Sequence, residues 1–557
     1  MYPCIFKSYL VFYYIIAYYG AMYIDVVPNR HSPPAILLRE SVRNGTTIRK
    51  RTLANFSLWE PARIDALRRA LRGEFDHLPT GEPVCGPVFG VLYALKHVAE
   101  DLGISSALGH TRSGKLALFL LLARVAHRGS RLSAVRWAQQ HAVSEILGLS
   151  HFDEDDLYAT LDVLAQRQER LEQQLYRRYV VRRGSTPLLF LYDVTSSYLE
   201  GEQNDLAAYG YNRDGKRGKP QIVIGLLTDE AGEPLAVRVF AGNTADPTTV
   251  PTQLTILKER FRVDDIVFVG DRGMVKAKGK AALSVAGLRY LTALSDPQVR
   301  RLLKRQVLQL DLFAEQVCEV QADGKRYILR KNEAEARKAR HRLDDKLSTL
   351  QALVAARNTK VATSPRCQPA AGLKALQTWV KRYKLSHLVS LGLDERQLTL
   401  MIDTAAHEQA LQLAGCYVLE TDVPAELLDT QTAHDRYKDL ACVEQDLRTL
   451  KTGLLEVRPI FVRKDNRTRG HVFVCLLALK LSRELQRRLA ATYGTTKDDP
   501  HGVTLHDALD TLHRLCLLTY PLDDTHSVTR LPRPDDQQTR LLQALQVPLP
   551  SRGACRQ

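Results

Sequence analysis

One stretch constrains the fold more than any other, Thr186 to Glu202, with the sequence TPLLFLYDVTSSYLEGE. Its apolar run, residues 188–192, has no helical period and predicts a strand buried on both faces. Asp193 follows this run directly, and an ionised carboxylate beside a buried strand needs a partner. For a single case, an Asp that caps a turn at the strand end is the ordinary interpretation.

A second stretch repeats this arrangement. In DDIVFVGDRGM, the apolar run Ile266 to Val269 ends in Gly270 and Asp271. Because adjacent strands lie about 4.8 Å apart, carboxylates at the ends of two neighbouring strands can converge on one metal-binding corner. The pair therefore predicts a cation site that neither Asp predicts alone.

The segment His434 to Thr452, HDRYKDLACVEQDLRTLKT, predicts an amphipathic helix, because its large apolar residues recur three and four positions apart. On this helix Glu444 follows Tyr437 by about two turns, and Lys451 follows Glu444 by about two turns, so the three side chains share one face. A carboxylate between a phenol and an ammonium, with Arg448 one turn on, suits a divalent metal beside a phosphodiester. The plainer alternative is an exposed face with an ion pair between Glu444 and Arg448.

Together, these residues and motifs resemble the DDE transposases of bacterial insertion sequences, specifically the insertion-sequence-four superfamily with its Tyr-Arg-Glu-Lys signature. The phrases AGNTADPTT (241–249) and VRPIFVRKDNRTRGHVFVCLLALKL (457–481) match as well. The resemblance covers most of the chain from about residue 22 to 482. Leu440 stands where the signature has Arg, and Arg448 or Arg436 are candidates to replace that phosphate contact.

The resemblance implies cut-and-paste movement of an insertion sequence by phosphoryl transfer. It assigns Asp193, Asp271 and Glu444 as catalytic residues that hold two Mg²⁺ or Mn²⁺ ions per active site. Water is first used to nick the element's end, and the end then passes through a hairpin. The freed 3′-hydroxyl is the nucleophile for strand transfer into target DNA. Tyr437 and Lys451 would orient phosphates near the cleaved strand. The implied partners are double-stranded DNA, as terminal inverted repeats and as target, and a second copy of the chain in the DNA complex.

The order of predicted elements indicates the fold class. Residues 222–227 and 235–240 alternate around turn residues and predict a hairpin, and a helix at 248–261 precedes the strand that ends at Asp271. Three antiparallel strands, a crossover helix and a further strand, with Asp on the first and fourth strands, is the order of a ribonuclease-H-like fold. We therefore expect an α/β protein with a ribonuclease-H-like catalytic core, a large insertion between the second Asp and the Glu, and a mostly helical N-terminal DNA-binding region. The expected divisions are an upstream extension (1–21), the N-terminal DNA-binding region (22–184), the first half of the catalytic core (185–290), the insertion subdomain (291–414), the second half of the core (415–490) and a C-terminal region (491–557).

Further candidate DNA contacts lie outside the signature helix. The basic, glycine-rich loop 210–221 adjoins Asp193 and can follow phosphates, although a solvated turn is the plainer alternative. Trp379 lies among basic residues of the insertion, where relatives hold a flipped base, or it is a core Trp of an amphipathic helix. A basic loop at 463–469 precedes an apolar helix. The candidate DNA-binding residues are Tyr437, Lys451, Arg448, Trp379, Arg213, Lys216, Arg217, Lys219, Arg463, Lys464, Arg467 and Arg469.

Several further patterns concern the N-terminal third of the chain and its C-terminal tail. Alternating segments predict a small antiparallel sheet over residues 22–57, and residues 113–129 predict a buried helix. The leucine stripe from Leu157 to Leu175 fits either a dimer seam or a helix docked inside its own domain. Short helices with basic surfaces suggest that the N-terminal part recognises the terminal repeats. The Pro- and Arg-bearing tail from Thr529 is typical of a surface segment or disorder.

The net charge of +16 predicts an anionic partner, for which nucleic acid is the obvious candidate, although charge alone leaves RNA or a membrane surface open. The nine cysteines include no Cys-x-x-Cys pair, which favours reduced thiols over zinc ligands or disulfides. The apolar helix 472–485 is too short and too interrupted by Lys480 to span a membrane. We expect a bacterial cytoplasmic, nucleoid-associated protein without a membrane partner. The apolar residues 1–21 favour translated upstream sequence over a signal anchor.

Two other functions fit the same residues. A nuclease with the ribonuclease-H fold would cut DNA without joining it. A catalytically inactive remnant would still bind DNA through its positive charge but would not cleave it. The intact acidic trio argues against this alternative.

Overall fold

The chain divides into two compact units. The structure is a computed structural model, and it describes residues 22–30, 32–44, 47–74, 82–201, 203–216, 218–451, 455, 457, 462–494, 502–521 and 527–550. The predicted upstream extension, residues 1–21, therefore lies outside the described residues. The first unit comprises residues 1–87, 516–533 and 550–557, and the second comprises residues 88–515 and 534–549.

The first unit contains two small sheets. The order β1-β2-β3, antiparallel throughout, confirms the sheet predicted for residues 22–57, and α2 packs against β1. The other sheet, in the order β16-β15-β4, joins segments that are more than 400 residues apart in sequence. The elements are β1 (Met22–Val27), β2 (Ala35–Asn44), β3 (Thr47–Asn55), α2 (Pro61–Leu71), β4 (Val84–Val88), β15 (Cys516–Pro521) and β16 (Ser527–Arg530).

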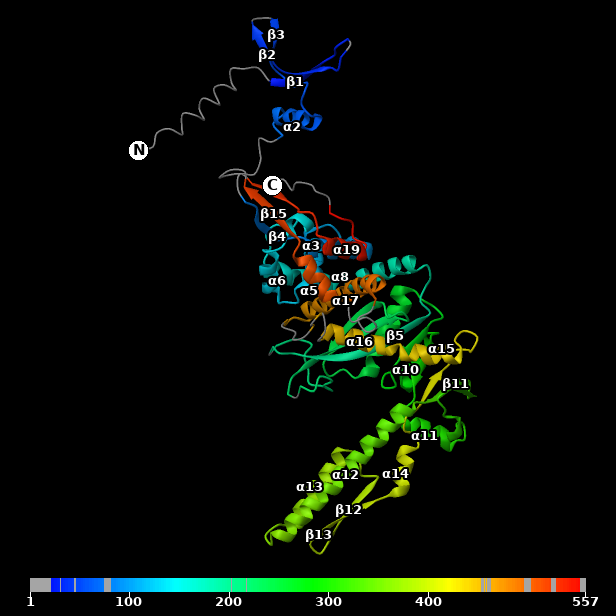
Figure 1. The fold of residues 1–557 in the computed structure, drawn as a ribbon. Coiled ribbons are helices and arrows are strands. Elements are labelled where there is room, and N and C mark those ends of the chain that lie inside the picture. The colour runs from blue at the N-terminus through cyan, green and yellow to red at the C-terminus, as the bar shows by residue number, and fades with distance from the viewer. Residues whose placement is uncertain are drawn as a thin grey trace. The chain divides into compact units, whose positions relative to one another are not determined.

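A mixed, eight-stranded sheet lies at the centre of the second unit, in the order β10-β11-β14-β9-β8-β5-β6-β7 (Figure 1). Strand β5 pairs antiparallel with β6 and parallel with β8, which in turn is parallel to β9. Strands β6 and β7 confirm the predicted hairpin. The strands are β5 (Leu189–Tyr198), β6 (Gln221–Asp229), β7 (Pro234–Ala241), β8 (Val267–Gly270), β9 (Arg289–Ala293), β10 (Cys318–Ala322), β11 (Lys325–Lys331) and β14 (Cys416–Thr421).

The connections of this sheet are mostly helical. The crossover from β7 to β8 contains the predicted helical segment, of which residues 256–261 adopt a π-helix. Strands β10 and β11 come from the sequence predicted as an insertion, yet they extend the main sheet through the pairing of β11 with β14. The connecting elements are η1 (Asp246–Thr249), α9 (Val250–Thr255), η2 (Ile256–Phe261), α10 (Ala277–Val285), α11 (Asp296–Lys304) and η3 (Leu310–Leu312).

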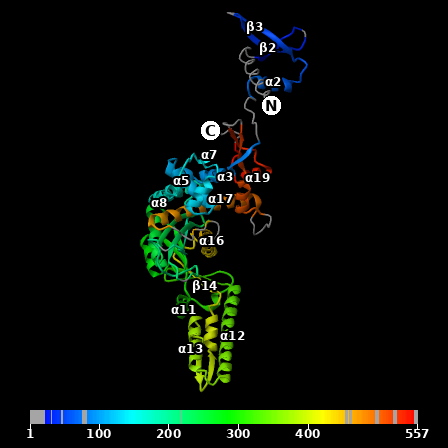
Figure 2. The same ribbon diagram turned by 90° about the vertical axis from the view of Figure 1, so that its left-hand side faces the viewer.

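The rest of the insertion has a core of its own. Helices α12 and α13 lie side by side against a two-stranded hairpin, β12 with β13 (Figures 1 and 2). Leu347, Leu350 and Val354 of α12 are buried there together with Leu376 and Val380 of α13. The elements are α12 (Glu333–Thr363), α13 (Pro369–Arg382), β12 (Val389–Asp394), β13 (Gln397–Ile402) and α14 (Thr404–Leu411).

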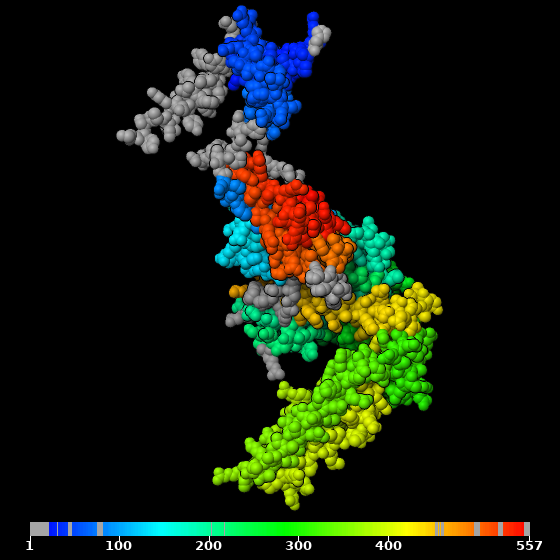
Figure 3. Space-filling view, in the orientation of Figure 1, coloured from blue at the N-terminus to red at the C-terminus, as the bar shows by residue number. Residues whose placement is uncertain are grey.

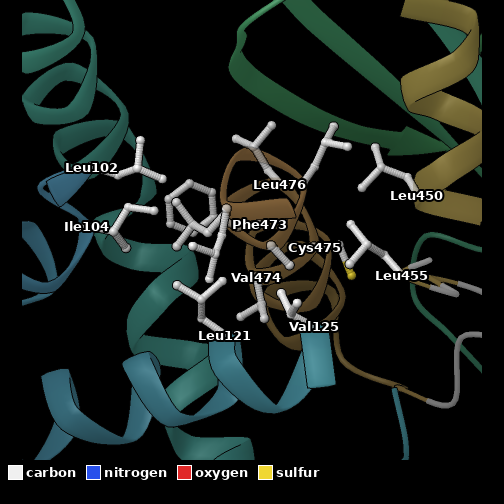
Figure 4. Close-up of a cluster of buried hydrophobic side chains, with 14 of the residues drawn as sticks. Leu102, Ile104, Leu121, Val125, Leu450, Leu455, Phe473, Val474, Cys475 and Leu476 are labelled. Carbon is white, nitrogen blue, oxygen red and sulfur yellow. The ribbon is translucent and has the colours of Figure 1, made fainter. Parts of the chain in front are cut away.

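Helix α17 is buried on nearly all sides and joins the N-terminal helices to the sheet. It packs against α3, α5, α8 and β7. Figure 4 shows Phe473 and Cys475 among buried side chains that include Leu121 and Val125 of α5 and Leu450. The helix is longer than the apolar segment predicted from the sequence, and Thr468, Arg488 and Leu489, which lie outside that segment, are buried as well. The elements are α3 (Gly90–Asp101), α4 (Ile104–Leu108), α5 (Arg112–Ala126), α6 (Arg131–Ala138), α7 (Val143–Leu147), α8 (Glu154–Arg183), α15 (Thr430–Lys438), α16 (Leu440–Lys451) and α17 (Asp465–Tyr493).

The leucine stripe of α8 lies inside the second unit. Leu157, Leu161, Leu164 and Leu171 are at most 2% exposed and belong to the same core as α17, so the stripe is an internal docking surface and not a free dimer seam. Gln168 fills the gap in the stripe, and its amide donates a 2.8 Å hydrogen bond to the carbonyl of Val237 in β7.

The prediction of a disordered or surface tail after Thr529 is wrong for part of the tail. Helix α19 (Asp536–Ala544) begins with a capping box between Asp535 and Gln538, and its Leu541 and Leu542 are buried. It packs against α17 and against α18 (Leu505–His513), which itself packs against α3. Figure 3 shows orange and red atoms of the C-terminal segment next to light-blue and cyan atoms of the second unit.

No helix within the described residues is both long and apolar enough to cross a membrane. The seven cysteines in the same part of the chain form no disulfide.

Candidate active site

Two of the three predicted acidic residues come from neighbouring parallel strands. The register pairs Tyr192 of β5 with Gly270 of β8, so Asp193 and Asp271 follow at the same level of the sheet. Asp271 ends its strand as predicted, but Asp193 lies within β5 and not at its end. The reason is that residues 194–198 continue to pair with β6, which extends the strand by five residues beyond Asp193.

The third acidic residue lies on α16, which packs against β5. Val443, Leu447 and Leu450 are buried beneath this helix, and Asp446 is held by Arg483 of α17 through two contacts of 2.7 Å. These contacts fix the rotation of the helix, and they leave Glu444 exposed on the side of the acidic pair.

The single helix predicted over residues 434–452 is in fact two. Helix α15 ends at Lys438 and α16 begins at Leu440, so Tyr437 is on a different helix from Glu444 and Lys451. Asp439 separates the two helices; Asp is a weak helix former, and its carboxylate accepts a 2.9 Å hydrogen bond from Arg436 in the preceding turn.

Two cavities, of about 540 and 330 Å³, adjoin the carboxylates. Asp193, Asp271 and Glu444 line both, so the structure brings the predicted trio together around one space. The larger cavity is also lined by apolar residues and by Arg272, Arg330, Tyr417, Tyr437, Lys438 and Leu440. The smaller one is also lined by Thr195, Arg213, Asp246, Met274, Arg448 and Lys451.

Asp193 lies in a buried environment with other carboxylates nearby. Burial, together with the charges of Glu444 and Asp271, raises the pKa of Asp193 to about 7, against the opposing effects of the Val194 amide and of Arg213.

The donor types fit a divalent cation, because carboxylate oxygens are the ligands that Mg²⁺ and Mn²⁺ prefer. In the described part of the chain, however, no three His, Cys, Asp or Glu side chains are close enough to form a ready-made metal site. Asp193 accepts a 2.8 Å hydrogen bond from the N–H of Val194, which holds its carboxylate against its own strand. The three carboxylates therefore line the same cavities, but they are not close enough together to form a ready-made metal site.

Tyr437 belongs to this site although it lies on α15. Burial raises the pKa of its phenol, and so do the charge of Asp271 and a hydrogen bond to that carboxylate. Tyr437 thus stays protonated and holds Asp271 in place.

The predicted DNA contacts divide into those at the cavities and those elsewhere. Arg448 is exposed and lines the smaller cavity, and Arg213 lines it too while its guanidinium binds Asp246 at 2.6 Å. Lys451 also lines this cavity and binds Asp214 at 2.7 Å. Lys216 and Lys219 are exposed on the adjoining loop, and Arg217 lies outside the described residues.

The remaining candidates line neither cavity. Trp379 is half-buried at the surface of the insertion core, and its ring packs in a tilted arrangement against Tyr383 at a centroid distance of 4.3 Å. Arg467 donates a 3.1 Å hydrogen bond to Asp162 of α8, and Arg469 donates one of 2.8 Å to the carbonyl of Val239. Arg463 and Lys464 are exposed just before α17.

The sequence did not single out several charged residues of the site. Arg272, Arg330 and Lys438 are cations of the larger cavity, and Asp214 and Asp246 bind the cations of the smaller one. The position of Arg272, directly after Asp271, could have indicated it. Leu440, at the place of the signature Arg, is 8% exposed at the wall of the larger cavity.

Comparisons with known proteins identify the family of the chain. No curated protein matches the chain. Among solved structures, the chain is similar to one titled "Cryo-EM structure of piggyBac transposase synaptic complex with hairpin DNA (SNHP)", with 10% identity, a TM-score of 0.33, and coverage of 79% of this chain and 78% of that one. A family model described as "Transposase DDE domain" matches residues 184–481, which is more than half of the chain. The chain therefore belongs to the transposase DDE domain family and is a transposase enzyme.

Proposed function

We propose that the protein moves a bacterial insertion sequence by cut-and-paste transposition, with Asp193, Asp271 and Glu444 as its catalytic residues. The observation that carries this proposal is that three carboxylates from β5, from the end of β8 and from α16 line the same two cavities. The order β7-β6-β5-β8-β9, with Asp on the first of these strands in sequence and after the fourth, supports a ribonuclease-H-like core. The Tyr-Glu-Lys residues support the insertion-sequence-four branch.

Asp193, Asp271 and Glu444 are the residues that would hold two Mg²⁺ or Mn²⁺ ions. Their oxygen donors, and the carboxylate charges of Glu444 and Asp271 that act on Asp193, support this assignment. When bound, such ions supply Lewis-acid activation of the nucleophile and charge stabilisation at the leaving oxygen.

The chain's own residues bind and orient the DNA in this proposal. Arg448 and Arg213 approach the scissile phosphate from the smaller cavity, and Tyr437 keeps the Asp271 carboxylate in position. Water attacks the phosphorus at the element's end, and the bond to the 3′-oxygen breaks, which leaves a 3′-hydroxyl. That hydroxyl attacks the phosphorus of the opposite strand and displaces the 3′-oxygen of the flanking DNA, which forms a hairpin. Water then hydrolyses the hairpin and regenerates the 3′-hydroxyl, which attacks a target phosphodiester and displaces its 3′-oxygen. Phosphate contacts of this kind position the DNA without reading its sequence.

The partners in this proposal are double-stranded DNA, as terminal inverted repeats and as target, and a second copy of the chain in the DNA complex. The net charge of +16 supports an anionic partner. The exposed basic residues Lys216, Lys219, Arg463 and Lys464, and Trp379 in the insertion, stay predicted DNA contacts. The proposed location is the nucleoid of a bacterial cytoplasm.

A strand-transfer assay tests the function directly. Inverted repeats bracketed by a short direct duplication in the flanking genomic DNA define the substrate, which is end-labelled and incubated with the full chain and a supercoiled plasmid. We expect covalent attachment of the label to the plasmid with Mg²⁺, and none with EDTA. Cleavage without attachment would instead identify a nuclease, and specific binding without cleavage would identify a DNA-binding remnant.

A further inference from the structure

Arg330, near the end of β11, is a cation of the larger cavity that hydrogen bonds hold in place. Its Nε donates a 2.9 Å hydrogen bond to the carbonyl oxygen of Glu315, and its Nη1 lies 3.0 Å from Nε2 of His434 on α15. Two further cations of this cavity, Arg272 and Lys438, are exposed. The guanidinium of Arg330 is therefore oriented before any ligand binds.

His434 is fully buried, and its two ring nitrogens have different roles. Its Nδ1 donates a 2.9 Å hydrogen bond to the carboxylate of Asp435, which leaves Nε2 as the acceptor for Arg330. The hydroxyl of Tyr417, which pairs with Arg330 across β11 and β14, also contacts Nε2. Burial lowers the pKa of His434, so its ring is neutral near pH 7 and does not repel the guanidinium.

These contacts position the guanidinium without neutralising it. Glu315 contributes a backbone carbonyl and His434 a neutral ring, so neither partner compensates the positive charge of Arg330. An Arg side chain has five N–H donors, and these two hydrogen bonds leave others for a ligand. A planar guanidinium that is already oriented suits the oxygens of a phosphate, which it can bind through two parallel hydrogen bonds.

We propose that Arg330 binds a phosphodiester of the element's end in the larger cavity, and that His434 holds the guanidinium in the orientation for this contact. This inference rests on the proposed function. The phosphate lies close to the scissile one, because Asp193, Asp271 and Glu444 line the same cavity. Arg330 touches the DNA in this account, and His434 is a positioning residue.

The alternative is that Arg330 only ties β11 to α15. A neutral donor would make the same hydrogen bonds to Glu315 and His434, and it would lose less hydration than a partly buried guanidinium does. The charge therefore favours a ligand of opposite charge, and the phosphates of DNA supply it.

The test measures binding of the full chain to the element's end in EDTA, so that it requires no cleavage. Arg330→Met should weaken binding by roughly 10-fold and lower the slope of log Kd against log salt by about one, as the loss of one phosphate contact does. A single methylphosphonate, which removes the charge of one phosphate, is then moved along both strands near the cleavage site. At the position that Arg330 contacts, the wild type should lose affinity and Arg330→Met should lose nothing further, because both changes remove the same contact.

Arg301→Met is the matched control, because Arg301 is exposed on α11 and lines neither cavity. It should bind the ends with the affinity and the salt slope of the wild type. His434→Leu should keep the salt slope and weaken binding less than Arg330→Met does, since the charge remains while its orientation is lost.

A wild-type salt slope in Arg330→Met would overturn the proposal, and so would methylphosphonate losses that equal those of the wild type at every position. If Arg330→Met does not fold, Arg330→Lys takes its place: its loss at the contacted position should be smaller than that of the wild type, and an equal loss at every position overturns the proposal. If the coupling is found but the wild-type chain cuts no DNA with Mg²⁺, the proposed function fails and the phosphate contact stands.

Discussion

Replacing Glu444 by Gln is expected to slow cleavage of the element's ends by at least about 10³-fold, because a metal-assisted phosphoryl transfer loses several kcal/mol when a ligand carboxylate becomes a neutral amide. Binding of the ends should change by no more than about twofold, since phosphate contacts and not the carboxylates supply the affinity. Cleavage is measured on end-labelled DNA in single turnover, and binding by gel retardation without metal.

The matched control is Glu408→Gln, which makes the same change at an exposed Glu of α14 that lines neither cavity. This variant should cleave like the wild type. Asp271→Asn and Asp193→Asn should behave like Glu444→Gln. Full cleavage by Asp271→Asn would refute the assignment of the trio.

Replacing Gly470 by Ala is expected to destabilise the second unit by about 3 kcal/mol, at the upper end of overpacking effects. A Cβ at Gly470 of α17 would lie 2.1 Å from the carbonyl oxygen of Leu161 and 2.8 Å from its carbonyl carbon. These are backbone atoms of α8, which can yield only if the two helices separate. Chemical denaturation followed by circular dichroism measures the loss.

Gly279→Ala is the control for this variant. Gly279 is also helical, in α10, but a Cβ there would meet its nearest neighbour, the Met274 carbonyl oxygen, at an ordinary 3.5 Å. The substitution should be neutral or stabilising by up to about 1 kcal/mol, since Ala favours helix over Gly. Equal stability of Gly470→Ala and wild type would show that the α8–α17 contact is looser than described.

The acidic site could be predicted from local patterns. Buried strands have continuous apolar runs, and an Asp at such a run is conspicuous, which identified Asp193 and Asp271; the helical period placed Glu444 opposite the buried leucines. Pairing over long sequence distances has no comparable local pattern. The joining of β11 to β14, and the contact of Lys451 with Asp214, 237 residues away, therefore could not be predicted.

The boundaries of helices and strands were the second source of error. Asp439 breaks the predicted helix after Tyr437, and pairing with β6 extends β5 past Asp193. In the tail, a capping box at Asp535 begins helix α19, which the Pro- and Arg-bearing composition did not predict. In each case a side-chain contact or a partner strand decided the outcome over propensity.

The enclosed position of α17 limits how this enzyme can be cut and recombined. Helix α17 packs against α3, α5, α8 and β7. A truncation inside residues 88–183 would therefore expose apolar side chains of α17 in the unit that carries the carboxylates. Chimeras between relatives should therefore keep residues 88–515 and 534–549 together, because these two ranges form one compact unit.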